Sequence, residues 1–194
     1  MEKMMQMKQG LLALALVGAA GSTMAQHVHG QAELEVAVSG DTLVLSLHSP
    51  LESLLGFEHA PRTAGQKAAA ENLLLQLRKP ETLFVPSAAA QCVTISAVMD
   101  APMLGAVRKV DGDQVAKGPA AAAKAAGHKE KEKQGHAELV AEFTFKCGRS
   151  DQLRGLEARL FDSFKRLRRV DVKVTAPGGQ SSARLTPSRR ALTW

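Results

Sequence analysis

Apolar and polar residues alternate over two neighbouring stretches, 32–38 and 43–48, and this period of two predicts a pair of β-strands. Gly40–Asp41, which lies between them, has the composition of a tight turn. With the turn placed there, apolar residues face one another in the pairs Val38–Leu43, Val36–Leu45 and Leu34–Leu47. We therefore predict a β-hairpin with one apolar and one polar face, and His48 lies opposite Glu33 on the polar face.

Two helices are expected after the hairpin. The stretch "SPLESLLG" predicts a short helix with Ser49 as its cap, Pro50 at its first position and Gly56 at its end. Residues 65–78 are rich in Ala and Leu, which favour helices, and this pattern stops before Pro80. The second helix is therefore predicted to be the longer of the two.

The later part of the chain alternates between strand and helix patterns. Residues 92–98 are rich in β-branched side chains, and residues 137–145 alternate between apolar and polar, so both predict strands. A helix is predicted over residues 151–168, because apolar residues recur there at spacings of three and four. These residues are Leu153, Leu156, Leu160, Phe164 and Leu167. Residues 170–176 and 183–194 are expected to form closing strands.

A change in composition divides the chain. Residues 101–135 contain nearly all of the low-complexity run "KGPAAAAKAAGHKEKEKQGH", which ends at His136; it lacks large apolar side chains and predicts a mobile loop. Residues 26–100 and 136–194 flank it, and each opens a strand with a similar stretch, "GQAELEV" or "GHAELVA". The predicted fold is therefore α+β, with two similar halves, each with antiparallel strands and a packed helix, joined by the loop.

Residues 1–25 have the pattern of a secretory signal peptide. Lys3 and Lys8 precede a short apolar run, and small residues at Thr23 and Ala25 suit cleavage after Ala25. The alternative is a membrane anchor, but the apolar run is shorter than the roughly 20 residues that span a bilayer. We therefore expect an exported, periplasmic protein without a membrane span in its mature chain.

Composition and charge narrow the range of partners. The formal net charge is +6, but the chain has no Tyr, one Trp and six Phe, so side chains that stack on bases are scarce. With export also predicted, no nucleic-acid partner is expected. The basic run "KRLRR" (165–169) is interpreted as the solvated end of the predicted helix, and the alternative is a patch for an anionic partner.

The two cysteines, Cys92 and Cys147, are an isolated pair. In an oxidising compartment such a pair predicts one disulfide, and the alternative is a pair of thiolate metal ligands. If the strands that carry them pair antiparallel, the start of one lies beside the end of the other. The bond would then clamp the base of the 101–135 loop.

The histidines supply the candidate chemistry. The chain has no H-E-x-x-H and no G-x-S-x-G motif, so nothing specifies an enzyme. His27 and His29 would project to the same side of an extended chain, and imidazole is a good zinc ligand. Solvated polar residues are the alternative for this pair, turn packing for Glu58 and His59, and a solvated spacer for the loop histidines. The candidate metal ligands are His27, His29, Glu58, His59, His128 and His136.

The opening of the mature chain resembles a known family. The stretch "HVHGQAELEVAVSGDTLVLSLHSPLESLLGFEHAP" is similar to the start of ZrgA-like proteins, an exported zinc-regulated family of Gram-negative bacteria. The cysteine before "VTI", the histidine-containing loop and "HAELVAEFTFKC" also resemble this family. The similarity extends over essentially the whole mature chain.

The resemblance implies a periplasmic protein that binds zinc as reversible cargo and supports high-affinity zinc uptake. The implied partners are zinc ions, a zinc importer and its periplasmic solute-binding protein. Members of the family often carry a loop packed with His and Asp, whereas this loop has His128 and His136 among Lys and Ala. The alternative is a periplasmic adaptor that contacts other proteins and has no physiological metal role.

Overall fold

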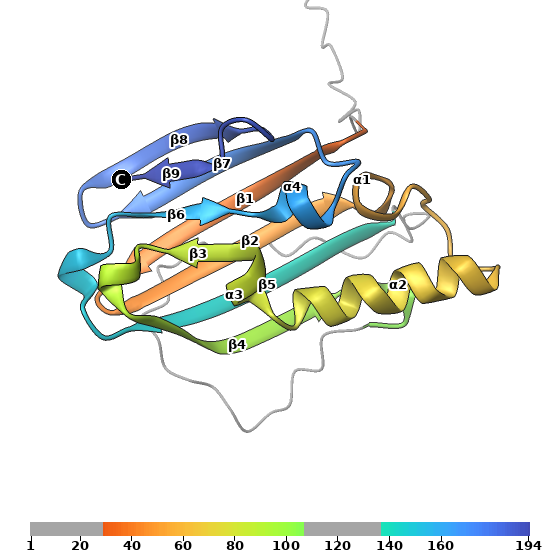
Figure 1. Ribbon diagram of the computed structural model, residues 1–194, viewed down its shortest axis with the longest axis horizontal. Coiled ribbons are helices and arrows are strands. Elements are labelled where there is room, and N and C mark those ends of the chain that lie inside the picture. The colour runs from red at the N-terminus through yellow and green to blue at the C-terminus, as the bar shows by residue number, and fades with distance from the viewer. Residues whose placement is uncertain (1–28, 107–136) are drawn as a thin grey trace, which may run out of the picture.

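The computed structural model of the protein describes residues 29–106 and 137–194 (Figure 1). A six-stranded sheet forms its larger layer, with the strands β1 (Gln31–Ser39), β2 (Thr42–Pro50), β4 (Cys92–Asp100), β5 (Glu138–Cys147), β7 (Arg169–Ala176) and β8 (Gly179–Leu185). Their order in space is β4-β5-β2-β1-β7-β8. Neighbouring strands are antiparallel except β1 and β7, which run parallel, so the sheet is mixed.

A second layer covers one face of this sheet (Figure 1). It contains an antiparallel three-stranded sheet in the order β3 (Phe84–Pro86), β6 (Gly155–Ala158) and β9 (Ala191–Thr193). The α-helices are α1 (Leu51–Leu55), α2 (Ala64–Leu77), α3 (Pro80–Leu83) and α4 (Leu160–Ser163). Single turns of 3₁₀ helix are formed by Ala88–Ala90, Pro102–Leu104 and Ser150–Gln152.

The hydrophobic core lies between the two layers. Leu34, Leu45 and Phe143 on the inner face of the large sheet are fully buried. Phe84 of β3 faces them, with its ring centroid 5.5 Å from that of Phe143. Burying a side chain of this size contributes about 1.5–3 kcal/mol, so the apolar faces that alternation predicts hold the layers together.

The predicted hairpin is confirmed residue by residue, because Val38 pairs with Leu43 and Glu33 pairs with His48. The helix predicted over residues 65–78 is confirmed as α2, which begins one residue earlier. The cap predicted at Ser49 for the short helix is wrong. Its hydroxyl donates to the carbonyl of the next residue, Pro50, which ends β2 instead of starting α1.

The helix predicted over residues 151–168 is also wrong. β6 occupies part of this segment and forms hydrogen-bonded ladders with β3 on one side and β9 on the other. Both partners come from distant parts of the sequence, and their pairing overrides the local helical pattern. The apolar residues of the pattern are nevertheless buried, since a strand, a turn and the short helix α4 all present them to the core: Leu153, Leu156, Leu160, Phe164 and Leu167.

The mixed α+β class is confirmed, but two similar halves are not shown. The large sheet takes β1, β2 and β4 from the first predicted half and β5, β7 and β8 from the second. The similar stretches "QAELEV" (31–36) and "AELVA" (137–141) lie in β1 and at the start of β5, which pair with β2 from its two sides. Their similarity is therefore that of two strands with a shared neighbour in one sheet.

The predicted disulfide between Cys92 and Cys147 is confirmed, so the alternative of two thiolate metal ligands is wrong. The bond joins the start of β4 to the end of β5. Its expected place at the base of the 101–135 loop is wrong, because the chain enters that segment after Asp100, which pairs with Val140 at the other end of the two strands. A strand rises about 3.3 Å per residue, so the two ends are about 25 Å apart.

Two further predictions fall outside the residues that the structure describes. These are the signal peptide over residues 1–25 and nearly all of the predicted 101–135 loop, of which the structure describes only residues 101–106.

Candidate metal centre

His29 lies in the turn directly before β1. Its side chain is 73% exposed, and Nδ1 lies 2.9 Å from Oε2 of Glu52 in α1. One nitrogen of the imidazole therefore faces a carboxylate, while most of the ring remains accessible to a ligand.

Glu52 is a largely buried carboxylate, with 21% of its side chain exposed. Oε2 is buried and accepts no hydrogen bond from the described part of the chain, although Nδ1 of His29 lies 2.9 Å away. Oε1 lies 3.9 Å from Nη1 of Arg166, whose guanidinium packs over Gly56. The carboxylate is thus placed between an imidazole and a guanidinium.

Gly30 fixes the backbone next to His29. Its N–H donates to Oγ of Ser53 at 3.0 Å, and its carbonyl accepts from the N–H of Arg168 at 2.7 Å. Gly30 has a φ of +74°, and a Cβ at this position would lie 2.9 Å from the carbonyl oxygen of Arg166, so glycine suits the position. These contacts tie the turn to α1 and to the chain before β7.

Glu58 and His59 lie in the loop that follows α1. Glu58 is exposed, whereas the ring of His59 stacks on Phe57 with a centroid distance of 5.3 Å. Nδ1 of His59 lies 2.9 Å from the carbonyl oxygen of Ala60. Since a carbonyl only accepts, this contact favours the proton on Nδ1 and leaves the lone pair on Nε2 for a metal.

Ala137 brings a later part of the sequence to the same end of the sheet. Its carbonyl accepts a hydrogen bond of 2.7 Å from the N–H of Leu51, the first residue of α1. His136 directly precedes Ala137 in the sequence. His136 itself, like His27 and His128, lies outside the described residues.

A complete metal site is not formed within residues 29–106 and 137–194. Those ranges contain no group of three or more His, Cys, Asp or Glu side chains that could hold an ion. A zinc site usually takes three or four protein ligands. His29 therefore needs partners from the rest of the chain or from a second molecule.

Glu52 and Arg166 were not predicted as site residues. A single carboxylate in a five-residue helix has no diagnostic spacing, and the basic run that contains Arg166 gave no indication of its partner. Only the fold brings α1 beside the segment before β7.

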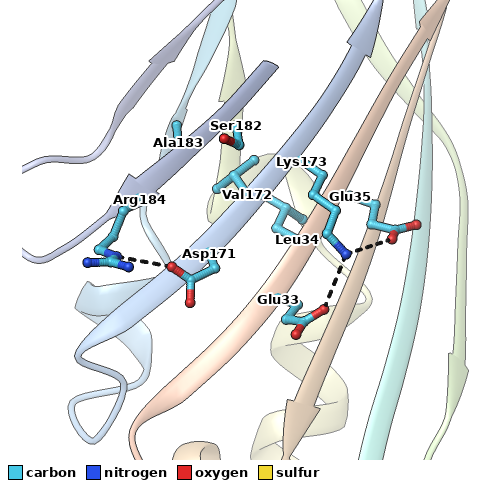
Figure 2. A pocket seen from close by; sticks show the side chains of 9 residues that line it. All are labelled: Glu33, Leu34, Glu35, Asp171, Val172, Lys173, Ser182, Ala183 and Arg184. Carbon is cyan, nitrogen blue, oxygen red and sulfur yellow. Dashed lines mark hydrogen bonds and ion pairs between the residues drawn. The ribbon is translucent and has the colours of Figure 1, made fainter. Parts of the chain in front are cut away.

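A shallow hollow of about 370 Å³ lies elsewhere, on the open face of the large sheet over β1, β7 and β8 (Figure 2). Nζ of Lys173 lies 3.8 Å from carboxylate oxygens of both Glu33 and Glu35, and Nε of Arg184 lies 3.1 Å from Asp171. These opposite charges pair across neighbouring strands, as they do on an ordinary solvated sheet face. We therefore do not assign this hollow to the site.

Among the described residues, two groups have shifted pKa values, and both shifts arise in exposed ion pairs. A hydrogen bond from Lys146 lowers the pKa of Asp41 in the turn between β1 and β2. A hydrogen bond to Glu157 raises the pKa of Arg159 after β6. Structural ion pairs shift pKa values without any catalytic role, so neither shift supports an active site.

These features define a disulfide-linked α+β protein with an exposed histidine fixed at the start of its first strand. A protein-family model described as ZrgA family zinc uptake protein matches residues 26–194, so the chain belongs to this family and the resemblance of its opening motif is confirmed. No curated protein matches the chain. Within the described ranges, no helix has the length and apolar character needed to cross a membrane.

Proposed function

We propose that this protein binds zinc reversibly in the periplasm and supports zinc uptake without catalysing a reaction. The observation that carries the proposal is His29, an exposed imidazole on a fixed turn in a chain of a zinc uptake family. An accessible imidazole is a suitable ligand for a metal that must be both captured and released.

The main ligands of the proposed site are three histidines. His27 and His29 are two residues apart, and His136 directly precedes Ala137, which is hydrogen-bonded to α1. Glu58 and His59 follow α1 along the chain and are candidates for a fourth ligand or for a second, weaker site with His128. All three main ligands are therefore close in the sequence to residues at the end of the sheet where Glu52 lies.

Zinc is the cargo in this proposal, and export places the protein where zinc is captured. The predicted signal peptide ends at Ala25, and the family match begins at residue 26, which supports export. The proposed recipients are a zinc importer and its periplasmic solute-binding protein.

Replacing His27 and His29 together by alanine is expected to weaken zinc binding by about 100-fold. Loss of one outer-shell partner already costs roughly 10- to 100-fold, and loss of two direct ligands should cost at least the upper value. The measurement is a competition titration with a zinc chelator of known affinity, using protein purified from the periplasm. His136→Ala should weaken binding by at least about 10-fold on the same reasoning.

His48→Ala is the matched control, because His48 is exposed but lies within the sheet opposite Glu33. This variant should bind zinc as the wild type does. Equal affinity of the wild type and the His27→Ala/His29→Ala variant would contradict the proposed site.

A periplasmic adaptor without a metal role is the second candidate. The incomplete ligand set within the described residues favours it, as does the scarcity of histidine in the 101–135 segment. Capture of the solute-binding protein, compared with and without added zinc, separates the two functions. Zinc-dependent capture supports zinc delivery, and equal capture in both conditions supports the adaptor.

A further inference from the structure

One oxygen of the Glu52 carboxylate lacks a hydrogen-bond donor among the described residues. Oε2 is buried and accepts no hydrogen bond from the described residues, although Nδ1 of His29 lies only 2.9 Å away. A buried carboxylate oxygen without a donor is costly, and a bond between charged and polar groups is among the stronger hydrogen bonds. When protonated, Nδ1 of His29 is a donor within hydrogen-bond distance of this oxygen.

The other side of Glu52 is already occupied. Nη1 of Arg166 lies 3.9 Å from Oε1, and the guanidinium also packs over Gly56, although the Arg166 side chain is 60% exposed. Glu52 is the second residue of the short helix α1, and the next residue, Ser53, accepts the hydrogen bond from Gly30. The carboxylate and the backbone beside His29 are therefore positioned by the same small helix.

We propose that Glu52 is the positioning residue of the zinc site. Nδ1–H of His29 donates to Oε2 of Glu52, which leaves the lone pair on Nε2 and directs that nitrogen away from the protein as the metal-binding atom. Metal-binding histidines are commonly held in this way by a carboxylate on their second nitrogen, which fixes the tautomer and makes the ligand more basic. This inference rests on the proposed zinc function, but the tautomer of His29 is a property of the metal-free protein.

The tautomer of His29 tests the inference without zinc. Long-range ¹H–¹⁵N spectra of the ¹⁵N-labelled protein at pH 8, where imidazole is ordinarily neutral, report which nitrogen carries the proton. We expect Nδ1–H in the wild type and a shift toward Nε2–H in Glu52→Ala. Glu52→Gln retains a side-chain oxygen that accepts, so it should preserve much of the Nδ1–H form, which a merely structural role of the charge would not explain.

Zinc affinity is the second readout. Glu52→Ala should weaken zinc binding by roughly 10- to 100-fold, the range found for outer-shell partners, and Glu52→Gln by less. Glu33→Ala is the matched control, because it removes another carboxylate that faces a histidine, His48, and both readouts for His29 should then be unchanged. Amide shifts of β1 and β2 confirm that each variant is folded.

The outcomes separate the inference from the function on which it rests. An Nε2–H tautomer in the wild type, or the same tautomer in the wild type and in folded Glu52→Ala, would overturn the positioning role. If the wild type binds no zinc but Glu52→Ala still shifts the tautomer, the zinc function fails while the role of Glu52 in orienting His29 is supported.

Discussion

Replacing Cys92 and Cys147 by alanine is expected to lower the free energy of unfolding by about 4 kcal/mol. The bond closes a loop between residues 55 apart in the sequence, and the chain-entropy relation gives this value for a loop of that length. The disulfide joins β4 and β5 at the end where the chain does not connect them. The chain passes from one strand to the other at the opposite end, where Asp100 pairs with Val140. Denaturant unfolding of the double variant and the oxidised wild type measures the difference.

Reduction of the wild type is the internal control for this prediction, since it breaks the bond without changing the sequence. Reduction of the wild type and the double substitution should both shift the unfolding midpoint to a lower denaturant concentration. A change in the free energy of unfolding below about 1 kcal/mol in both experiments would contradict the prediction. The disulfide would then not restrict the unfolded chain as the chain-entropy relation requires. Zinc affinity should change little, since Cys147 lies beside the β1–β2 turn, at the opposite end of β1 from His29.

Gly155→Ala is expected to lower the free energy of unfolding by about 3 kcal/mol. A Cβ at this position would overlap the carbonyl oxygen of Leu192 in β9 and approach Cα of Thr193. Overfilling a packed site costs about 1–3 kcal/mol, and the upper value applies because the obstacle is backbone and not a movable side chain. The variant should therefore separate β6 from β9.

Trp194 gives a direct readout of this separation. It is the only tryptophan, it follows β9, and its backbone N–H donates to the carbonyl of Arg154, next to Gly155. Its fluorescence should report an earlier unfolding transition in Gly155→Ala. Gly65→Ala is the matched control, because nothing lies within 4 Å of a Cβ there and Ala favours the helix α2. Equal stability of the two variants would contradict the close packing of β6 on β9.

Local patterns predicted the parts of the fold that form between neighbours in the sequence. The β1–β2 hairpin followed from alternation and one turn, and α2 followed from composition and the proline after it. The disulfide followed from having two cysteines in a chain that the sequence predicts to be exported. In each case the decisive physical signal lies within a short stretch or in a simple count.

Long-range pairing produced what the sequence did not reveal. β1 pairs in parallel with β7, from the far end of the chain, and β6 lies between β3 and β9. The 151–168 segment buries apolar residues at spacings of three and four because they form part of the core between the two layers. Most of the segment is nevertheless not helical. A helical spacing of apolar residues cannot by itself distinguish a helix from a strand followed by a turn.

The candidate site divides in the same way. His29 was recognised from its spacing to His27 and from the family motif, because both are readable in sequence. Glu52 and Arg166 become site residues only when α1 lies beside the segment before β7. Contacts of this kind depend on the tertiary structure and have no signature of their own.

The most direct test of the account is the X-ray absorption spectrum at the zinc edge of the protein loaded with one equivalent of zinc. Zinc–imidazole coordination has distances of about 2.0–2.1 Å and a recognisable scattering pattern from the ring. We predict imidazole ligands in the wild type and a smaller imidazole contribution in His29→Ala, with His48→Ala unchanged. A spectrum without imidazole, or one that His29→Ala leaves unaltered, would contradict the assignment of His29 as a zinc ligand.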